Sequence, residues 1–118
     1  MRQRNLEAHA WVKELPAEII VCDAAGLLIE MNEAAEELFA SDGGRGLLGS
    51  DVLDCHSGAD RSKLERMIKE GRSNAYINEE SGSLTFFFQS PWYRDGRYAG
   101  FVEISFQVPG EIPHYLRE

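Results

Sequence analysis

The sequence lacks any apolar run long enough to cross a membrane, because no stretch approaches the roughly 20 apolar residues that a membrane-spanning helix needs. Basic residues are also scarce: 12 Lys and Arg stand against 20 Asp and Glu, which gives a net charge of −8. This charge would repel a phosphate backbone. We therefore expect neither a membrane nor a nucleic acid as a partner.

Cysteine is nearly absent as well, since the chain has only Cys22 and Cys55, and these form no C-x-x-C motif. Their wide separation disfavours a structural disulfide in a reducing compartment. The N-terminal stretch MRQRNLEAHAWVKEL carries charges throughout and has no apolar core like that of a signal peptide. The expected location is the cytoplasm.

The length of 118 residues suits one hydrophobic core and is too short for two ordinary domains. An amphipathic pattern in residues 1–14 predicts a flanking helix that Pro16 brings to an end. Residues 15–108 are expected to form the domain. Residues 109–118 contain two prolines and form a tail that packs along an edge or reaches a partner.

The first half of the domain predicts a hairpin followed by a helix. Two short apolar runs, 18–23 and 27–31, flank a turn in which Gly26 can supply a positive φ. Asn32 is a suitable N-cap for the next helix, because its side chain can accept a hydrogen bond from a free backbone N–H.

The second half predicts one helix and three strands. Asp60 is expected to cap a helix that ends at Gly71. The strands are expected at residues 73–78, 83–93 and 97–108. The pair Asp95-Gly96 is typical of a tight hairpin turn between the last two. This order of elements indicates an α+β fold with an antiparallel sheet.

Three stretches taken together resemble a PAS domain, the small sensor module of many bacterial signalling proteins. They are LPAEIIVCDAAGLLIEMNEAAEELF, LLGSDVLD and FFFQSPWYRDGRYAGFVEIS. The resemblance implies a five-stranded antiparallel sheet in the order 2-1-5-4-3, with helices covering one face over a pocket. Such modules bind small ligands or cofactors, or pair with one another. We expect a stand-alone module that acts as a homodimer or through a signalling partner.

The resemblance turns one set of alternating strand residues toward this pocket: Thr85, Phe87, Gln89, Phe101, Glu103 and Ser105. Gln89 and Glu103 would then lie close together on neighbouring strands. A buried carboxylate must find a partner or take up a proton, so Glu103 is a candidate ligand anchor. The alternative is that Glu103 faces solvent, or bonds only to Gln89 or His56.

Cys55 and His56 stand side by side and are predicted to form one wall of the pocket. Thiolate and imidazole both bind zinc and haem iron, but adjacent residues cannot readily point at one ion, and structural zinc takes four ligands. A haem sensor with His56 as axial ligand is kept as one hypothesis. The simpler interpretation is that Cys55 fills core space and His56 makes a local hydrogen bond.

The hypothesis of a light-sensing flavin site depends on the residue at one position. Light-sensing PAS domains carry a reactive cysteine in a G-x-N-C motif, and the matching residue here is Val52. Photo-adduct chemistry of that type is therefore disfavoured. The cofactor, if there is one, stays unidentified.

The opposite face of the predicted sheet is too apolar to be left in water. We expect the N-terminal helix or a second subunit to cover it. The predicted dimer interface consists of Leu6, Trp11, Phe86, Phe88, Trp92 and Ile104.

The sequence thus favours a signal-sensing module with a pocket near Cys55, His56, Gln89 and Glu103 for an unidentified small molecule. The alternative is a pure homodimerisation or protein-interaction module whose core its own Phe side chains fill. Catalysis by Cys55, His56 and Glu103 is disfavoured, because no motif places them as nucleophile, base and orienter. The sequence also contains no P-loop, G-x-S-x-G or H-E-x-x-H motif.

Overall fold

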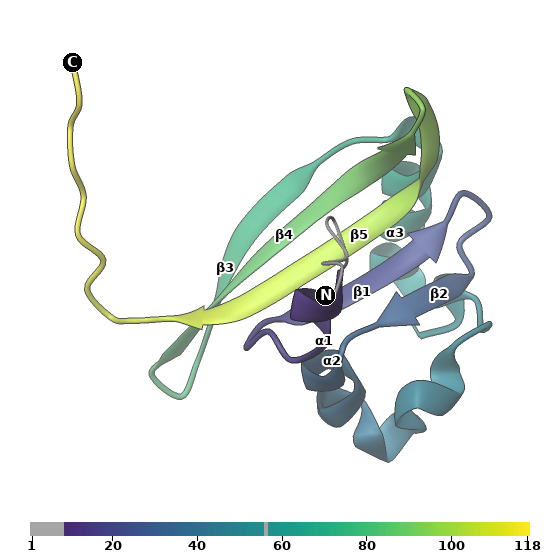
Figure 1. The fold of residues 1–118 in the computed structure, drawn as a ribbon, viewed down its shortest axis with the longest axis horizontal. Helices are drawn as coiled ribbons and strands as arrows, with labels where there is room; N and C mark the ends of the chain where they lie inside the picture. The colour runs from purple at the N-terminus through teal and green to yellow at the C-terminus, as the bar shows by residue number, and fades with distance from the viewer. Residues whose placement is uncertain (1–8, 56) are drawn as a thin grey trace, which may run out of the picture.

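The computed structural model describes residues 9–55 and 57–118, and its main feature is one antiparallel sheet (Figure 1). The sheet has five strands in the order β2-β1-β5-β4-β3, so the predicted fold class and strand order are confirmed. The strands are β1 Glu18–Asp23, β2 Leu28–Met31, β3 Asn74–Glu80, β4 Ser83–Arg94 and β5 Arg97–Val108.

The longer helices lie on one side of this sheet. In order along the chain the helices are α1 Ala10–Lys13, α2 Glu33–Leu38 and α3 Gly58–Glu70, with the short 3-10 helices η1 Ala40–Asp42, η2 Gly44–Leu47 and η3 Val52–Cys55 between α2 and α3. Figure 1 draws α3 behind the sheet and α1 in front of it. None of the helices in the described residues is long and apolar enough to cross a membrane.

The hairpin turns follow from residues that accept a positive φ. Asp95 and Gly96 have φ values of 51° and 78°, which allows a two-residue turn whose twist matches that of strands β4 and β5. Ser81 and Gly82, with φ values of 51° and 82°, connect β3 to β4 in the same way. Because each turn has only two residues, the two turns fix the register of β3, β4 and β5.

The helix ends agree with the sequence at two positions and differ at one. Asn32 caps α2 as predicted, since its side chain accepts from the backbone N–H of Ala35. Gly71 ends α3 in a left-handed conformation, also as predicted. The predicted cap at Asp60 is wrong, because α3 begins at Gly58 after an extended Ser57. Asp60 lies instead in the first turn, where the helix dipole favours a negative charge.

A small core joins α3 to the sheet. Met67 and Ile68 of α3 pack with Cys22 of β1 and Phe101 of β5, and all four are less than a tenth exposed. The partly buried side chains packed against them are Val52, Leu64 and Tyr98. Burying each large side chain is worth about 2 kcal/mol, so this cluster holds α3 over one end of the sheet.

The sheet face away from α3 leaves apolar side chains in contact with solvent. Phe88 and Phe106 are 38% and 37% exposed. Trp11 of α1 is 62% exposed, so its own side chain is not buried against that face. Leu6, the other predicted cover, lies outside the described residues. After Val108 the chain runs away from the sheet as an extended tail, as Figure 1 shows.

Candidate functional site

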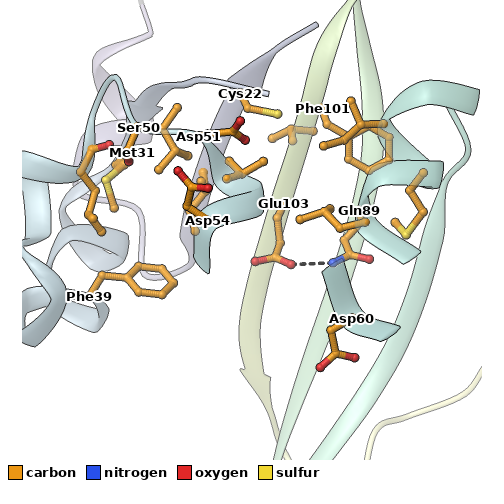
Figure 2. A pocket seen from close by; sticks show the side chains of 18 of the residues that line it. Cys22, Met31, Phe39, Ser50, Asp51, Asp54, Asp60, Gln89, Phe101 and Glu103 are labelled. Atoms are coloured by element: carbon orange, nitrogen blue, oxygen red, sulfur yellow. Dashed lines mark hydrogen bonds between the residues drawn. The ribbon is translucent and has the colours of Figure 1, made fainter. Parts of the chain in front are cut away.

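A cavity of about 950 Å³ lies between the sheet and the covering helices (Figure 2). This volume is within the range of small-molecule pockets, which hold roughly 300 to 1,000 Å³. Most of its lining is apolar: Ile20, Cys22, Leu28, Met31, Phe39, Leu47, Val52, Leu64, Met67, Ile68, Phe101 and Val102. The cavity therefore suits a molecule with a substantial apolar body.

A row of three polar side chains crosses the sheet wall of this cavity. Asn74 on β3 is directly opposite Gln89 on β4, and Gln89 is directly opposite Glu103 on β5. The Nδ2 of Asn74 donates to Oε1 of Gln89 over 3.0 Å, and the Nε2 of Gln89 donates to Oε1 of Glu103 over 2.7 Å. Alternation along paired strands is what puts all three on one face.

The direction of this hydrogen-bond row is set by Glu103. An ionised carboxylate only accepts hydrogen bonds, so the amide nitrogen of Gln89 must face it. The oxygen of Gln89 then faces Asn74, which must donate. Each amide therefore donates in the direction of Glu103, and the row ends on that carboxylate at the cavity. Figure 2 shows its last hydrogen bond, from Gln89 to Glu103.

Four further carboxylates line the cavity, and two of them already have partners. Oδ1 of Asp51 accepts from the backbone N–H of Leu53 over 2.9 Å. Asp54 lies 3.5 Å from the guanidinium of Arg61. The other two are Asp42 and Asp60, both exposed at the rim. Among the described lining residues the single basic side chain is that of Lys63, which is also exposed.

Tyr76, two residues after Asn74 on β3, also lines the cavity and makes an aromatic contact. Its ring stacks on Phe87 with centroids 4.8 Å apart and planes at 10°. Burial raises the pKa of the Tyr76 hydroxyl, and the negative charges of Glu103 and Asp60 raise it further. A tyrosine hydroxyl is protonated at neutral pH in any case, so this one can donate to a molecule in the cavity.

Cys22 is a cavity residue that the sequence reasoning missed. The residue is 4% exposed, and burial raises the pKa of its thiol, so the thiol stays neutral and behaves as an apolar group. The signal was present in the alternation of β1, which puts Ile20 and Cys22 on the same face as Phe101 and Glu103. Alternation alone does not tell which of the two faces of β1 lies toward the cavity.

The structure brings some predicted ligand-binding residues together and leaves others aside. Gln89, Phe101 and Glu103 line the cavity. Thr85, Phe87 and Ser105 lie further along the strands and are not among the lining residues. Ser105 is buried, and its hydroxyl donates to Glu18 over 3.3 Å.

The predicted Cys-His wall cannot be placed in the same way. Cys55 ends η3, whose Val52 and Asp54 line the cavity, but the Cys55 side chain is outside the described part of the structure. His56 is outside it entirely. Within the described residues, no group of three or more His, Cys, Asp and Glu side chains is arranged to hold a metal ion.

The strand order and the cavity under the helices define the class of α+β domain, and comparison with solved structures identifies the fold. No protein-family model and no curated protein matches the sequence. The PAS domain of a protein from Colwellia psychrerythraea aligns with 83% of this chain and 91% of its own, with a TM-score of 0.59 and 16% identity. This chain therefore has the PAS fold that its sequence resembles.

Two receptors from Vibrio cholerae share this fold. The Aer2 receptor, described as a dual PAS-heme oxygen sensor, aligns with 79% of this chain and 95% of its own, with a TM-score of 0.58 and 12% identity. The VqmA dimer, a LuxR-type receptor, aligns with 98% of this chain and 58% of its own, with a TM-score of 0.63 and 18% identity. At these identities the likeness is one of fold.

Proposed function

We propose that this chain is a sensory module that binds a small, mainly apolar molecule in the cavity between the sheet and α3. The observation that carries the proposal is the cavity of about 950 Å³ with a polar row, Asn74 to Glu103, crossing one apolar wall. An apolar pocket with a few convergent polar groups is the usual form of a small-molecule site. The oxygen-sensor role named for the Aer2 receptor supports the same assignment.

The proposed signal is a change in how firmly α3 is held against the sheet. Three side chains of α3 line the cavity: Met67 and Ile68 are buried in the core, whereas Leu64 is only partly buried against it. A bound molecule would add apolar contacts to Leu64 and so shift the balance toward the closely packed state. A second copy or a partner protein would respond to that shift. We propose a binding role and no catalysis, in a reducing compartment where Cys22 stays a free thiol.

Filling the cavity is expected to abolish ligand capture. In Leu64→Trp the larger ring would occupy space that the ligand needs, whereas Leu38→Trp changes an α2 side chain that is 56% exposed and outside the lining. We expect a small molecule to leave the wild-type and Leu38→Trp proteins on denaturation, detected by mass spectrometry, and none to leave Leu64→Trp. Equal capture by all three proteins would contradict this site.

An absorption spectrum of the purified protein tests the coloured cofactors. A Soret band that disappears in His56→Ala would establish haem as the occupant, and flavin bands would establish a flavin. A colourless protein that still releases a molecule on denaturation supports the uncoloured ligand that we propose.

A pure dimerisation module is the second candidate, and the exposed Phe88 and Phe106 on the outer sheet face favour it. Among the predicted interface residues, Trp92 has an internal role, since its Nε1 donates to the carbonyl oxygen of Cys22 over 3.0 Å. A substitution at Trp92 would therefore disturb the fold as well as an interface. Phe88 and the neighbouring Ile104 are directly opposite one another and are better placed for a test.

Phe88→Glu is expected to convert a homodimer to monomer, because it places a charge in an apolar contact. Leu38→Glu is the matched control, since Leu38 is exposed on the helix side of the molecule. The mass of each variant in solution is measured by light scattering. A dimer that survives Phe88→Glu unchanged at micromolar concentration would exclude this face as the interface.

A further inference from the structure

The cavity has a pronounced asymmetry of charge. Within the described residues, five carboxylates line it and one ammonium does: Asp42, Asp51, Asp54, Asp60 and Glu103 against Lys63. Most of these side chains are at the exposed rim, where water screens their charges. Glu103 and Asp51 are only partly exposed, and Asp51 is engaged with the backbone of Leu53. Of these two carboxylates, Glu103 is the one at which the row from Asn74 and Gln89 ends.

The hydrogen bonds of Glu103 leave it with unused acceptor capacity. Within the described part of the chain, Gln89 is the one side chain that bonds it, through Oε1. A carboxylate has room for about four hydrogen bonds in total. The second oxygen is therefore open to a donor from the cavity, and a donor that carries positive charge makes the stronger bond.

The hydrogen-bond row strengthens this preference. Each amide in the row points its donor end toward Glu103, so Asn74 and Gln89 both favour negative charge at the carboxylate. Asp60 and Glu103 both line the cavity. Asp60 adds a negative charge from α3, across from the sheet.

We infer that the cavity selects an organic cation, namely a protonated amine with an apolar body, whose ammonium group donates to Glu103 while the body lies against the apolar lining. This inference rests on the proposed binding function and specifies its ligand class. Apolar contacts would supply most of the affinity, and the charged hydrogen bond would supply the discrimination. An anion held by Lys63 is the competing arrangement.

Three probes with the same indole body separate these arrangements: tryptamine is a cation at neutral pH, tryptophol is neutral and indole-3-acetate is an anion. Binding to the full chain is measured by titration with ¹⁵N–¹H correlation spectra, which also report whether each variant is folded. We expect tryptamine to bind about 10-fold more tightly than tryptophol, as a charged hydrogen bond predicts. Indole-3-acetate should bind most weakly.

Glu103→Gln and Glu79→Gln form a matched pair of variants. Both remove one negative charge, but Glu79 is exposed on β3 outside the lining, whereas glutamine at 103 can still accept from Gln89. We expect Glu103→Gln to lose the roughly 10-fold preference for tryptamine and to bind tryptophol as before. Glu79→Gln should keep the preference.

The outcomes distinguish the ligand class from the binding function. If tryptophol binds the wild-type protein as tightly as tryptamine, or indole-3-acetate binds best, the cavity is a site but the cationic ligand is wrong. If the preference persists in Glu103→Gln, its assignment to Glu103 is wrong. If none of the three probes shifts any cavity resonance, both the ligand class and the proposed function are contradicted.

Discussion

Replacing Gly100 by alanine is expected to lower the free energy of unfolding by about 4 kcal/mol, the sum of a backbone strain and an overpacking cost. Gly100 on β5 has a φ of 152°, which residues with a Cβ rarely adopt. A Cβ there would clash with the carbonyl oxygen of Cys22 and would lie 2.8 Å from the Cα of Asp23. Both contacts are with backbone of β1, which cannot turn aside as a side chain can.

The close approach at Gly100 also serves Trp92. Trp92 on β4 is directly opposite Gly100, and its indole N–H reaches the same Cys22 carbonyl oxygen. Separating β1 from β5 to admit a methyl group would disturb this hydrogen bond and the core around Cys22 and Phe101. The melting temperature should fall by about 15 °C or more, since each kcal/mol shifts it by several degrees in a domain of this size.

Two other glycines separate strain from steric conflict. Gly82 has a φ of 82° and nothing within 4 Å of an added Cβ, so Gly82→Ala should cost only the left-handed strain of about 1 kcal/mol. Gly46 has neither a positive φ nor a neighbour within 4 Å, and Gly46→Ala should change stability by about 0.5 kcal/mol at most. Urea unfolding measures all three variants. A Gly100→Ala loss no greater than that of Gly82→Ala would refute the predicted clash.

The fold was predictable because its local signals agree with each other. Asn32 and Gly71 mark helix ends, and Asp95-Gly96 makes a turn that only a hairpin uses, so local chemistry alone gives most of the elements. The strand order came from the resemblance, since alternation within one strand says nothing about which strand is its neighbour. The position of Asp60 was misjudged because Ser57 and Asp60 are both plausible caps at the sequence level.

The site was predictable only along the strands. Alternation predicted that Gln89 and Glu103 share a face, and the structure shows the hydrogen bond between them. Alternation could not show that Asn74 extends this hydrogen-bond row, because the position of Asn74 opposite Gln89 depends on the register between β3 and β4. Nor could it show that Phe87 and Ser105 lie beyond the cavity, because the reach of the covering helices along the sheet is a tertiary property.

Asn32 has a larger role than the helix cap that the sequence indicated. Its side chain is 3% exposed and makes four hydrogen bonds, which is all that an amide side chain can make. Oδ1 accepts from the backbone N–H groups of Ile19 and Ala35 over 3.0 and 3.1 Å. Nδ2 donates to the carbonyl oxygens of Val12 and Ala17 over 3.0 and 2.7 Å.

Asn32→Ala is therefore expected to lower the free energy of unfolding by about 4 kcal/mol, because it leaves several buried backbone groups without partners at about 1 to 3 kcal/mol each. Loss of an N-cap alone would cost about 1 kcal/mol. Asn78→Ala, on the exposed part of β3, is the matched control and should have little effect. Chemical unfolding of the wild-type, Asn32→Ala and Asn78→Ala proteins measures the loss. A loss near ~1 kcal/mol in Asn32→Ala would mean that Asn32 acts only as a helix cap.

Asn32→Asp separates the hydrogen bonds that this side chain accepts from those that it donates. A carboxylate can still accept from Ile19 and Ala35, so α2 keeps its cap, but it cannot donate to Val12 and Ala17 and would repel both carbonyl oxygens. Amide hydrogen exchange should then quicken in residues 9–17 and stay slow at Ala35. Since Asn32 directly follows Met31, which lines the cavity, one side chain links the cavity wall to α1. Uniform exchange across both segments would show that the link is not separable from the cap.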